Sequence, residues 1–161
     1  MNKYWKYELF PGFLDDVTDC TFVNMEDVDL TSVLNHITKL AIEDFLYPRV
    51  SLAYSEDTSF DPLDSAPYGY YFTDERIGVA EYKVIWAFMK YYWVQTQITM
   101  DANFRNPFLD PSIKGYSPAN MLNSMREMLQ LFEKNAIKAR FDYGRTSEDG
   151  KPRWGKINAK L

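Results

Sequence analysis

Apolar residues recur at steps of three and four along three stretches of the chain, which is the spacing of one face of an α-helix. We therefore predict three main helices, at about residues 30–46, 73–99 and 117–143. Pro48 ends the first of them, because a proline disfavours helical geometry in the residue before it. Thr73 begins the second as its N-cap and is followed by two acidic residues, which suit the first turn of a helix.

A short strand or hairpin is expected between the first two helices, where Val50, Leu52 and Tyr54 alternate with small residues. The chain before the first helix shows no sustained period. Gly144 suits the end of the third helix. The predicted fold class is therefore all-α, in one domain at 1–161 with an irregular N-terminal arm at 1–29, a helical body at 30–143 and a basic C-terminal tail at 144–161.

The second predicted helix carries two apolar stripes rather than one. A helix that is apolar on nearly every face must be buried on nearly every face, and a chain of 161 residues has few other elements to cover it. We therefore expect the second stripe to contact a neighbouring subunit. Its residues are Tyr82, Ile85, Trp86, Met89 and Trp93.

Composition favours a globular protein and offers little for catalysis. The chain is 46% hydrophobic and 17% aromatic, too apolar for a disordered protein. Cys20 and His36 are the sole cysteine and histidine, which is too few for a zinc site. A single cysteine also excludes an intramolecular disulfide. No phosphate-binding or nucleophile motif occurs, so we expect neither an enzyme nor a metal or cofactor. No membrane span or signal peptide is expected.

Charge is divided unevenly along the chain. Residues 1–75 carry four basic and fifteen acidic side chains, a net charge of −11, whereas residues 76–161 carry fourteen basic and eight acidic ones, a net charge of +6. Such asymmetry suits self-association or docking onto charged partners, and a solvated acidic region explains it equally well.

Three segments follow one another in an order that resembles a known family. They read AIEDFLYPRVSLAY at 41–54, YYFTDERIGVAEYKVIWAFMKYYWVQTQI at 70–98 and YSPANMLNSMREMLQLFEKNAIKARFDY at 116–143. The first has a P-x-V-x-L-x-Y strand, the second an F-T-x-E-x-I start and a Trp–Gln end, and the third an S-x-A-N-x-L start. In this order they resemble the head–tail connector (adaptor, or neck) proteins of long-tailed bacteriophages over about two-thirds of the chain.

The resemblance implies a structural protein of the virion, assembled in the bacterial host cytoplasm. It implies a ring, twelvefold like the portal, that docks on the portal protein and links the capsid to the next neck or tail component. Double-stranded DNA would pass through the ring without sequence-specific binding, and no membrane would be involved. Acidic side chains on the channel wall would let DNA slide, and the channel-facing candidates are Asp57, Asp61 and Asp64.

The C-terminal tail is the expected portal-docking element. In the connector family this segment contacts the portal, and here an aromatic residue lies among basic ones, which suits docking into an acidic groove. A flexible solubilising tail is the alternative. The candidate docking residues are Arg145, Lys151, Arg153, Trp154, Lys156 and Ile157.

Two other functions remain open. A small helical nucleic-acid-binding regulator is favoured by the basic second half and by Arg126, Lys134, Lys138 and Arg140 on one helix. The net acidic charge and the absence of a helix-turn-helix spacing argue against it. Another neck or tail-completion protein is the second alternative, and it would be richer in sheet.

Overall fold

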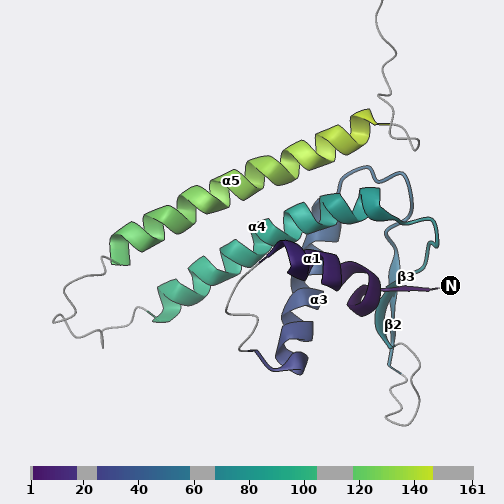
Figure 1. Ribbon diagram of the computed structural model, residues 1–161, viewed down its shortest axis with the longest axis horizontal. Coiled ribbons are helices and arrows are strands. Elements are labelled where there is room, and N and C mark those ends of the chain that lie inside the picture. The colour runs from purple at the N-terminus through teal and green to yellow at the C-terminus, as the bar shows by residue number, and fades with distance from the viewer. Residues whose placement is uncertain (1, 18–24, 59–67, 105–117, 147–161) are drawn as a thin grey trace, which may run out of the picture.

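The computed structural model describes residues 2–17, 25–58, 68–104 and 118–146. Helices dominate this part of the chain, with a small antiparallel sheet at one end (Figure 1). The mainly helical prediction with a short hairpin is confirmed, but the expected number of three helices is wrong. The described helices are α1 (Phe10–Asp16), α3 (Asp27–Asp44), α4 (Val79–Phe104) and α5 (Pro118–Arg145), and a π-helix, η1 (Trp5–Leu9), precedes α1.

The sheet has three short strands in the order β1–β3–β2, all antiparallel. They are β1 (Lys3–Tyr4), β2 (Tyr54–Asp57) and β3 (Gly69–Phe72). The predicted strand at 50–54 is displaced, because only Tyr54 belongs to β2. Val50 and Leu52 are buried nonetheless, in irregular chain that leads into the strand.

The helix predicted at 30–46 is α3, and it begins and ends slightly earlier than expected. Asp27 and Asp29 lie in its first turn, where carboxylates complement the positive helix N-terminus. The predicted apolar face is the buried one, with Leu34, Ile37 and Ala41 enclosed. The periodicity therefore identified the correct face.

The helix predicted at 73–99 begins instead at Val79. The Thr73 N–H donates to the Ala53 carbonyl at 3.0 Å, which extends the β2–β3 hairpin. Asp74 then accepts a hydrogen bond from the Arg76 N–H, closing a turn. Thr73 was a misleading start signal, because an Asx-type turn uses the same polar residues as a helix cap.

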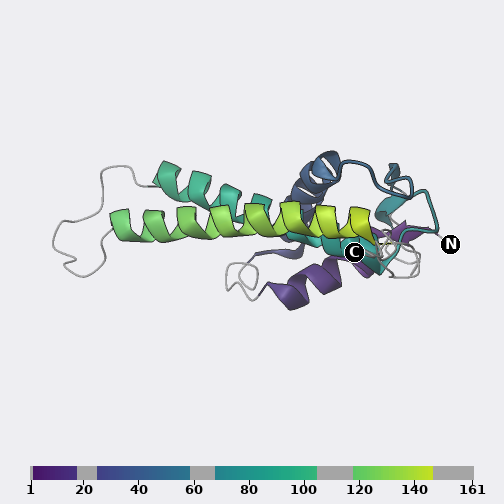
Figure 2. The same ribbon diagram turned by 90° about the horizontal axis from the view of Figure 1, so that it is seen from above.

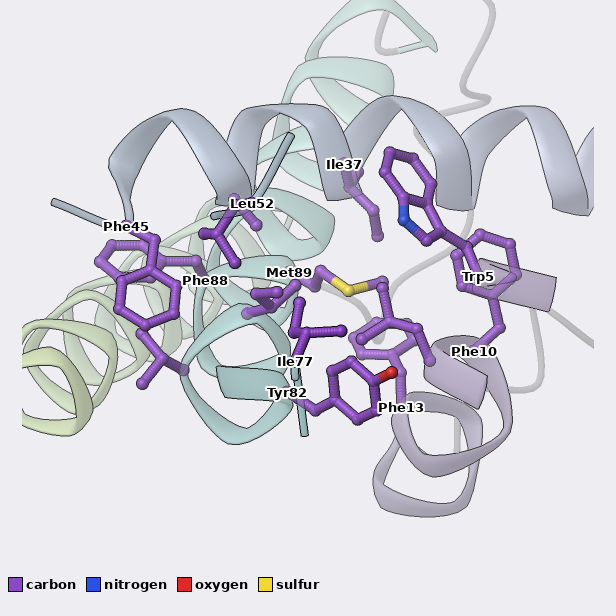
Figure 3. Packing of buried hydrophobic residues seen from close by; sticks show 14 of the residues in the cluster. Trp5, Phe10, Phe13, Ile37, Phe45, Leu52, Ile77, Tyr82, Phe88 and Met89 are labelled. Carbon is purple, nitrogen blue, oxygen red and sulfur yellow. The ribbon is translucent and has the colours of Figure 1, made fainter. Parts of the chain in front are cut away.

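The N-terminal segment is no irregular arm. Trp5 and Leu9 of η1 and Phe10 and Phe13 of α1 are buried in the core. Trp5 stacks on Tyr70 at 5.1 Å between ring centroids. Figure 3 shows the N-terminal aromatic rings next to residues of α4. The segment lacks a helical period over its whole length because it changes from strand to π-helix to α-helix within fifteen residues.

This segment covers the stripe of α4 that was expected to contact another subunit. Tyr82, Ile85, Met89 and Trp93 are buried within the single chain. Trp86 is half-buried, and its indole Nε1–H donates to the Leu9 carbonyl at 2.9 Å. Tyr82, Ile85, Met89 and Trp93 therefore have little surface left for a neighbouring subunit, whereas the interface role of Trp86 stays a prediction.

The helices α4 and α5 form a long antiparallel hairpin, with α1 and α3 on opposite sides of it (Figure 2). The helix predicted at 117–143 corresponds closely to α5. Residues at alternating steps of three and four make its inner seam, where Ala136 is fully buried. The seam residues are Met125, Leu129, Phe132, Ala136, Ala139 and Tyr143.

Replacing Gly12 by alanine tests the packing of α1 on α4. A Cβ at this position would lie 2.3 Å from Trp86 Cζ2. The indole cannot withdraw without losing its hydrogen bond to Leu9. We expect Gly12→Ala to destabilise the protein by about 1–3 kcal/mol, the cost of overpacking, although alanine usually favours a helix.

The matched control is Gly144→Ala, because an added Cβ there meets nothing within 4 Å. Urea unfolding of both variants would measure the difference. A Gly12→Ala protein as stable as the unchanged chain would show that α1 does not pack against Trp86.

Candidate interaction surfaces

A buried network joins the start of α4 to the end of α5. Glu81 is only 6% exposed. Its Oε2 accepts a hydrogen bond from the Gly78 N–H at 2.9 Å, which is the glutamate half of a capping box at the N-terminus of α4. Its Oε1 accepts from the Tyr143 hydroxyl at 2.7 Å. One carboxylate therefore caps one helix and fixes the end of another.

Arg49 completes this network from the chain that follows α3. Its N–H donates to the Tyr143 hydroxyl at 3.0 Å, and its guanidinium lies over the Tyr143 ring at 4.1 Å from the centroid. Nη2 donates to the carbonyl oxygens of Tyr143 and Thr146. A cation at these carbonyls complements the negative C-terminus of α5.

An open cavity of about 720 Å³ lies beside the network. Exposed Arg76 and Lys83 stand at it, and the Arg76 guanidinium pairs with Asp74 at 2.8 Å. This pair holds the pKa of the Asp74 carboxyl well below its usual range. Apart from Arg49 and Val50, the lining comes from the basic second half of the chain, namely Arg76, Gly78, Val79, Ala80, Glu81, Lys83, Val84, Ala139, Asp142, Tyr143 and Thr146.

A second hollow, of about 590 Å³, lies between η1, α3 and the β2–β3 hairpin. Lys6 donates to the Tyr68 hydroxyl at 3.1 Å, and Lys39 donates to the Tyr70 hydroxyl at 2.8 Å. These hydrogen bonds raise the pKa of both lysines. His36 lines the hollow and is exposed. Both lysines are therefore held in place by tyrosine hydroxyls.

Large apolar side chains are exposed on several elements, among them the turn after α3 and α5. Leu46 and Tyr47 protrude from the turn after α3, and Tyr47 is 90% exposed. Met128, Leu131 and Phe141 are exposed along α5. Exposed large apolar residues of this kind are suited to burial at protein-binding surfaces.

The residues predicted to act in docking or at a channel are only partly within the described structure. Arg145 is exposed in the last turn of α5. Asp57 is half-buried in β2 and accepts a hydrogen bond from the Tyr4 hydroxyl at 3.2 Å, so it is tied to the sheet. The predictions for Asp61, Asp64, Lys151, Arg153, Trp154, Lys156 and Ile157 lie outside the described residues.

Sequence reasoning missed the residues that shape the cavity and the protruding turn. Glu81 lies three residues after Gly78, the spacing at which a glutamate side chain can reach back to the N–H at the start of a helix. The Tyr47–Pro48 pair indicated only a helix end. No local pattern connects Arg49 with Tyr143, which lie 94 positions apart.

Among the described residues, no group of three or more histidine, cysteine, aspartate or glutamate side chains could hold a metal ion. No helix in that part of the chain has the length and apolar character needed to cross a membrane. No protein-family model, curated protein or solved structure matches this chain.

Replacing Tyr143 by phenylalanine tests the network. It removes a hydrogen bond from the buried Glu81 carboxylate and an acceptor from the Arg49 N–H. We expect a loss of about 1–3 kcal/mol in the free energy of unfolding, the cost of unsatisfied buried groups. Tyr7→Phe, at an exposed tyrosine, is the control. Equal stability of the two variants in urea would show that the network contributes nothing.

The same variant should change the response to alkaline pH. Burial, followed by the hydrogen bond to Glu81, raises the pKa of Tyr143 to about 12. The pKa of Tyr143 is therefore higher in the folded protein than in the unfolded chain, where it is about 10. The stability that the protonated Tyr143 side chain contributes is complete below pH 10 and is lost as the pH rises towards 12. Unfolding free energies measured from pH 9 to 12 should therefore converge for the unchanged and Tyr143→Phe proteins as the pH rises. A constant difference across this range would contradict the assignment.

Proposed function

We propose that this chain is a structural protein of a bacteriophage virion, forming the ring that connects the portal to the next neck or tail component. Double-stranded DNA passes through the ring, and the chain acts by docking rather than by catalysis. The observation that carries the proposal is the set of large apolar side chains left exposed on a well-packed body, at Leu46, Tyr47 and along α5. Such side chains are suited to burial by partners.

The arrangement of the described helices supports the same proposal. The segments that resemble connector proteins supply the turn after α3, the first residue of β2, most of β3, and most of α4 and α5. The α4–α5 hairpin extends beyond the rest of the body (Figure 1). Its outer face is therefore accessible to neighbouring proteins in an assembly.

The division of charge also fits an assembly protein. The acidic half, net −11, can face DNA or a basic partner, whereas the basic half, net +6, can face acidic partners or the next copy. Asp57, with Asp61 and Asp64, remains the proposed acidic segment near the DNA path.

The nucleic-acid-binding alternative has one observation in its favour. Arg126, Lys134 and Lys138 are exposed on α5, although Glu127 and Glu133 are interleaved with them. Arg140 does not add to this surface, because its Nη1 donates to the Asp44 carbonyl at 3.0 Å. A salt titration of duplex-DNA binding separates the two functions, since a regulator shows a steep salt slope and a connector shows little affinity.

Removing the tail tests the proposed docking role. The truncation belongs after Thr146, because its carbonyl accepts a hydrogen bond from Arg49. We expect helix content and thermal melting to stay nearly unchanged, while binding to the portal protein of the same phage is lost. Trp154→Ala in the full chain should weaken binding by about 2 kcal/mol or more, the effect of an interface hot spot.

Lys160→Ala is the matched control in the same tail, and calorimetry with purified portal measures the full chain and all three variants. Portal binding by the truncated chain equal to that of the full chain would place the docking surface elsewhere. Absence of portal binding by the full chain would contradict the proposed function itself.

A further inference from the structure

The strand β2 forms one edge of the sheet, with β3 on its paired side. The Thr73 N–H donates to the Ala53 carbonyl, so these two opposed residues form a hydrogen-bonded pair at the start of the hairpin. Hydrogen-bonded and non-hydrogen-bonded pairs alternate along an antiparallel ladder. Ser55 is therefore bonded to β3, whereas the N–H and C=O of Tyr54 and Glu56 point to the open side of β2.

This open side is exposed and acidic. Tyr54, Ser55 and Glu56 are exposed, and Asp57 at the end of the strand is half-buried. A strand edge with outward-pointing N–H and C=O groups is a template for pairing with another extended segment. Because opposite charges across a ladder are favourable and like charges are not, the edge of β2 favours a basic segment.

The last six residues of the chain have the pattern of such a segment. They read KINAKL, in which polar and apolar residues alternate without a break. This is the period of a half-buried strand. Residues 151–161 carry four basic side chains and no acidic one, so their charge is complementary to that of the β2 edge. A segment of this kind gains main-chain hydrogen bonds by strand addition, and its alternate side chains give specificity.

The origin of the tail lies close to β2. The helix α5 ends on the side of the molecule that carries the sheet (Figures 1 and 2). Arg49 Nη2 donates to the carbonyl of Thr146, the last described residue, and the five residues from Arg49 to Tyr54 span at most about 18 Å. Lys156 follows Thr146 by ten residues, which can span about 33 Å. The tail is thus long enough to reach β2 of its own chain, and the short connection gives it a high effective concentration there.

We propose that residues 156–161 add to the open edge of β2 in the same chain as a fourth strand. Their main-chain groups pair with those of Tyr54 and Glu56. Their apolar side chains lie on the face of Tyr54, whose ring is 5.0 Å from the Trp5 ring, and their lysines lie on the face of Asp57. The inference goes beyond the proposed function, because it states what the tail contacts before another protein binds it.

Amide hydrogen exchange, measured by nuclear magnetic resonance, tests this arrangement residue by residue. We call the N–H groups of Tyr54 and Glu56 the edge amides. They should exchange about tenfold more slowly in the full chain than in a chain that ends at Thr146, which corresponds to docking for about nine-tenths of the time. The Ser55 N–H is the internal control, because its hydrogen bond to β3 protects it equally in both chains.

Charge reversal tests which part of the tail is responsible. Lys156→Glu combined with Lys160→Glu places like charges beside the acidic edge. The edge amides of this variant should exchange as fast as those of the shortened chain. Lys151→Glu combined with Arg153→Glu is the matched control, because it changes the charge of the same tail by the same amount outside residues 156–161. This control should keep most of the protection.

Equal exchange of the edge amides in the full and shortened chains would overturn the inference, as would equal effects of the two charge reversals. A mixture of isotope-labelled shortened chain with unlabelled full chain tests whether the strand comes from the same chain. The labelled edge amides should stay fast in this mixture, and their protection would assign the strand to another copy instead. These measurements need no portal protein, so failure of portal binding would refute the proposed function and leave this inference intact.

Discussion

The fold depends on covering one helix, α4, whose apolar residues face in nearly every direction. One side of α4 is shielded from water by α3, a second by α5, and a third by η1 and α1. The close approach of Gly12 to Trp86 shows how little space separates α1 from α4. Because α3, α5 and the N-terminal segment all meet on one helix, the core is a set of contacts between separate elements with α4 at its centre.

The polar network at the end of the α4–α5 hairpin gives these contacts their register. Tyr143 of α5 joins Glu81 of α4 to Arg49 in the chain after α3, because its hydroxyl donates to Glu81 and accepts from the Arg49 N–H, and its carbonyl accepts from the Arg49 guanidinium. Buried polar groups tolerate few alternative arrangements, because an unpaired one is costly. The network therefore fixes how far α5 can slide along α4, and it shapes the cavity beside it.

Helix content and the buried faces of α3 and α5 could be predicted from sequence, since their apolar spacing is regular. The role of the N-terminal segment could not, because a strand, a π-helix and a short α-helix in succession leave no single period to detect. The two stripes of α4 correctly indicated burial on several sides, but periodicity cannot say whether Trp86 meets its own chain or another. The protruding Tyr47 was equally hidden, since exposure is a property of the folded turn.

The pairing of the N-terminal segment with α4 has a consequence for synthesis of the protein. Phe10 and Phe13 leave the ribosome long before Trp86 of α4, against which their segment packs and which lies about 75 positions later. At typical translation rates this interval lasts roughly 4 to 15 seconds. During that time these aromatic side chains lack their native partners on α4, so this part of the core can form only after α4 has been synthesised.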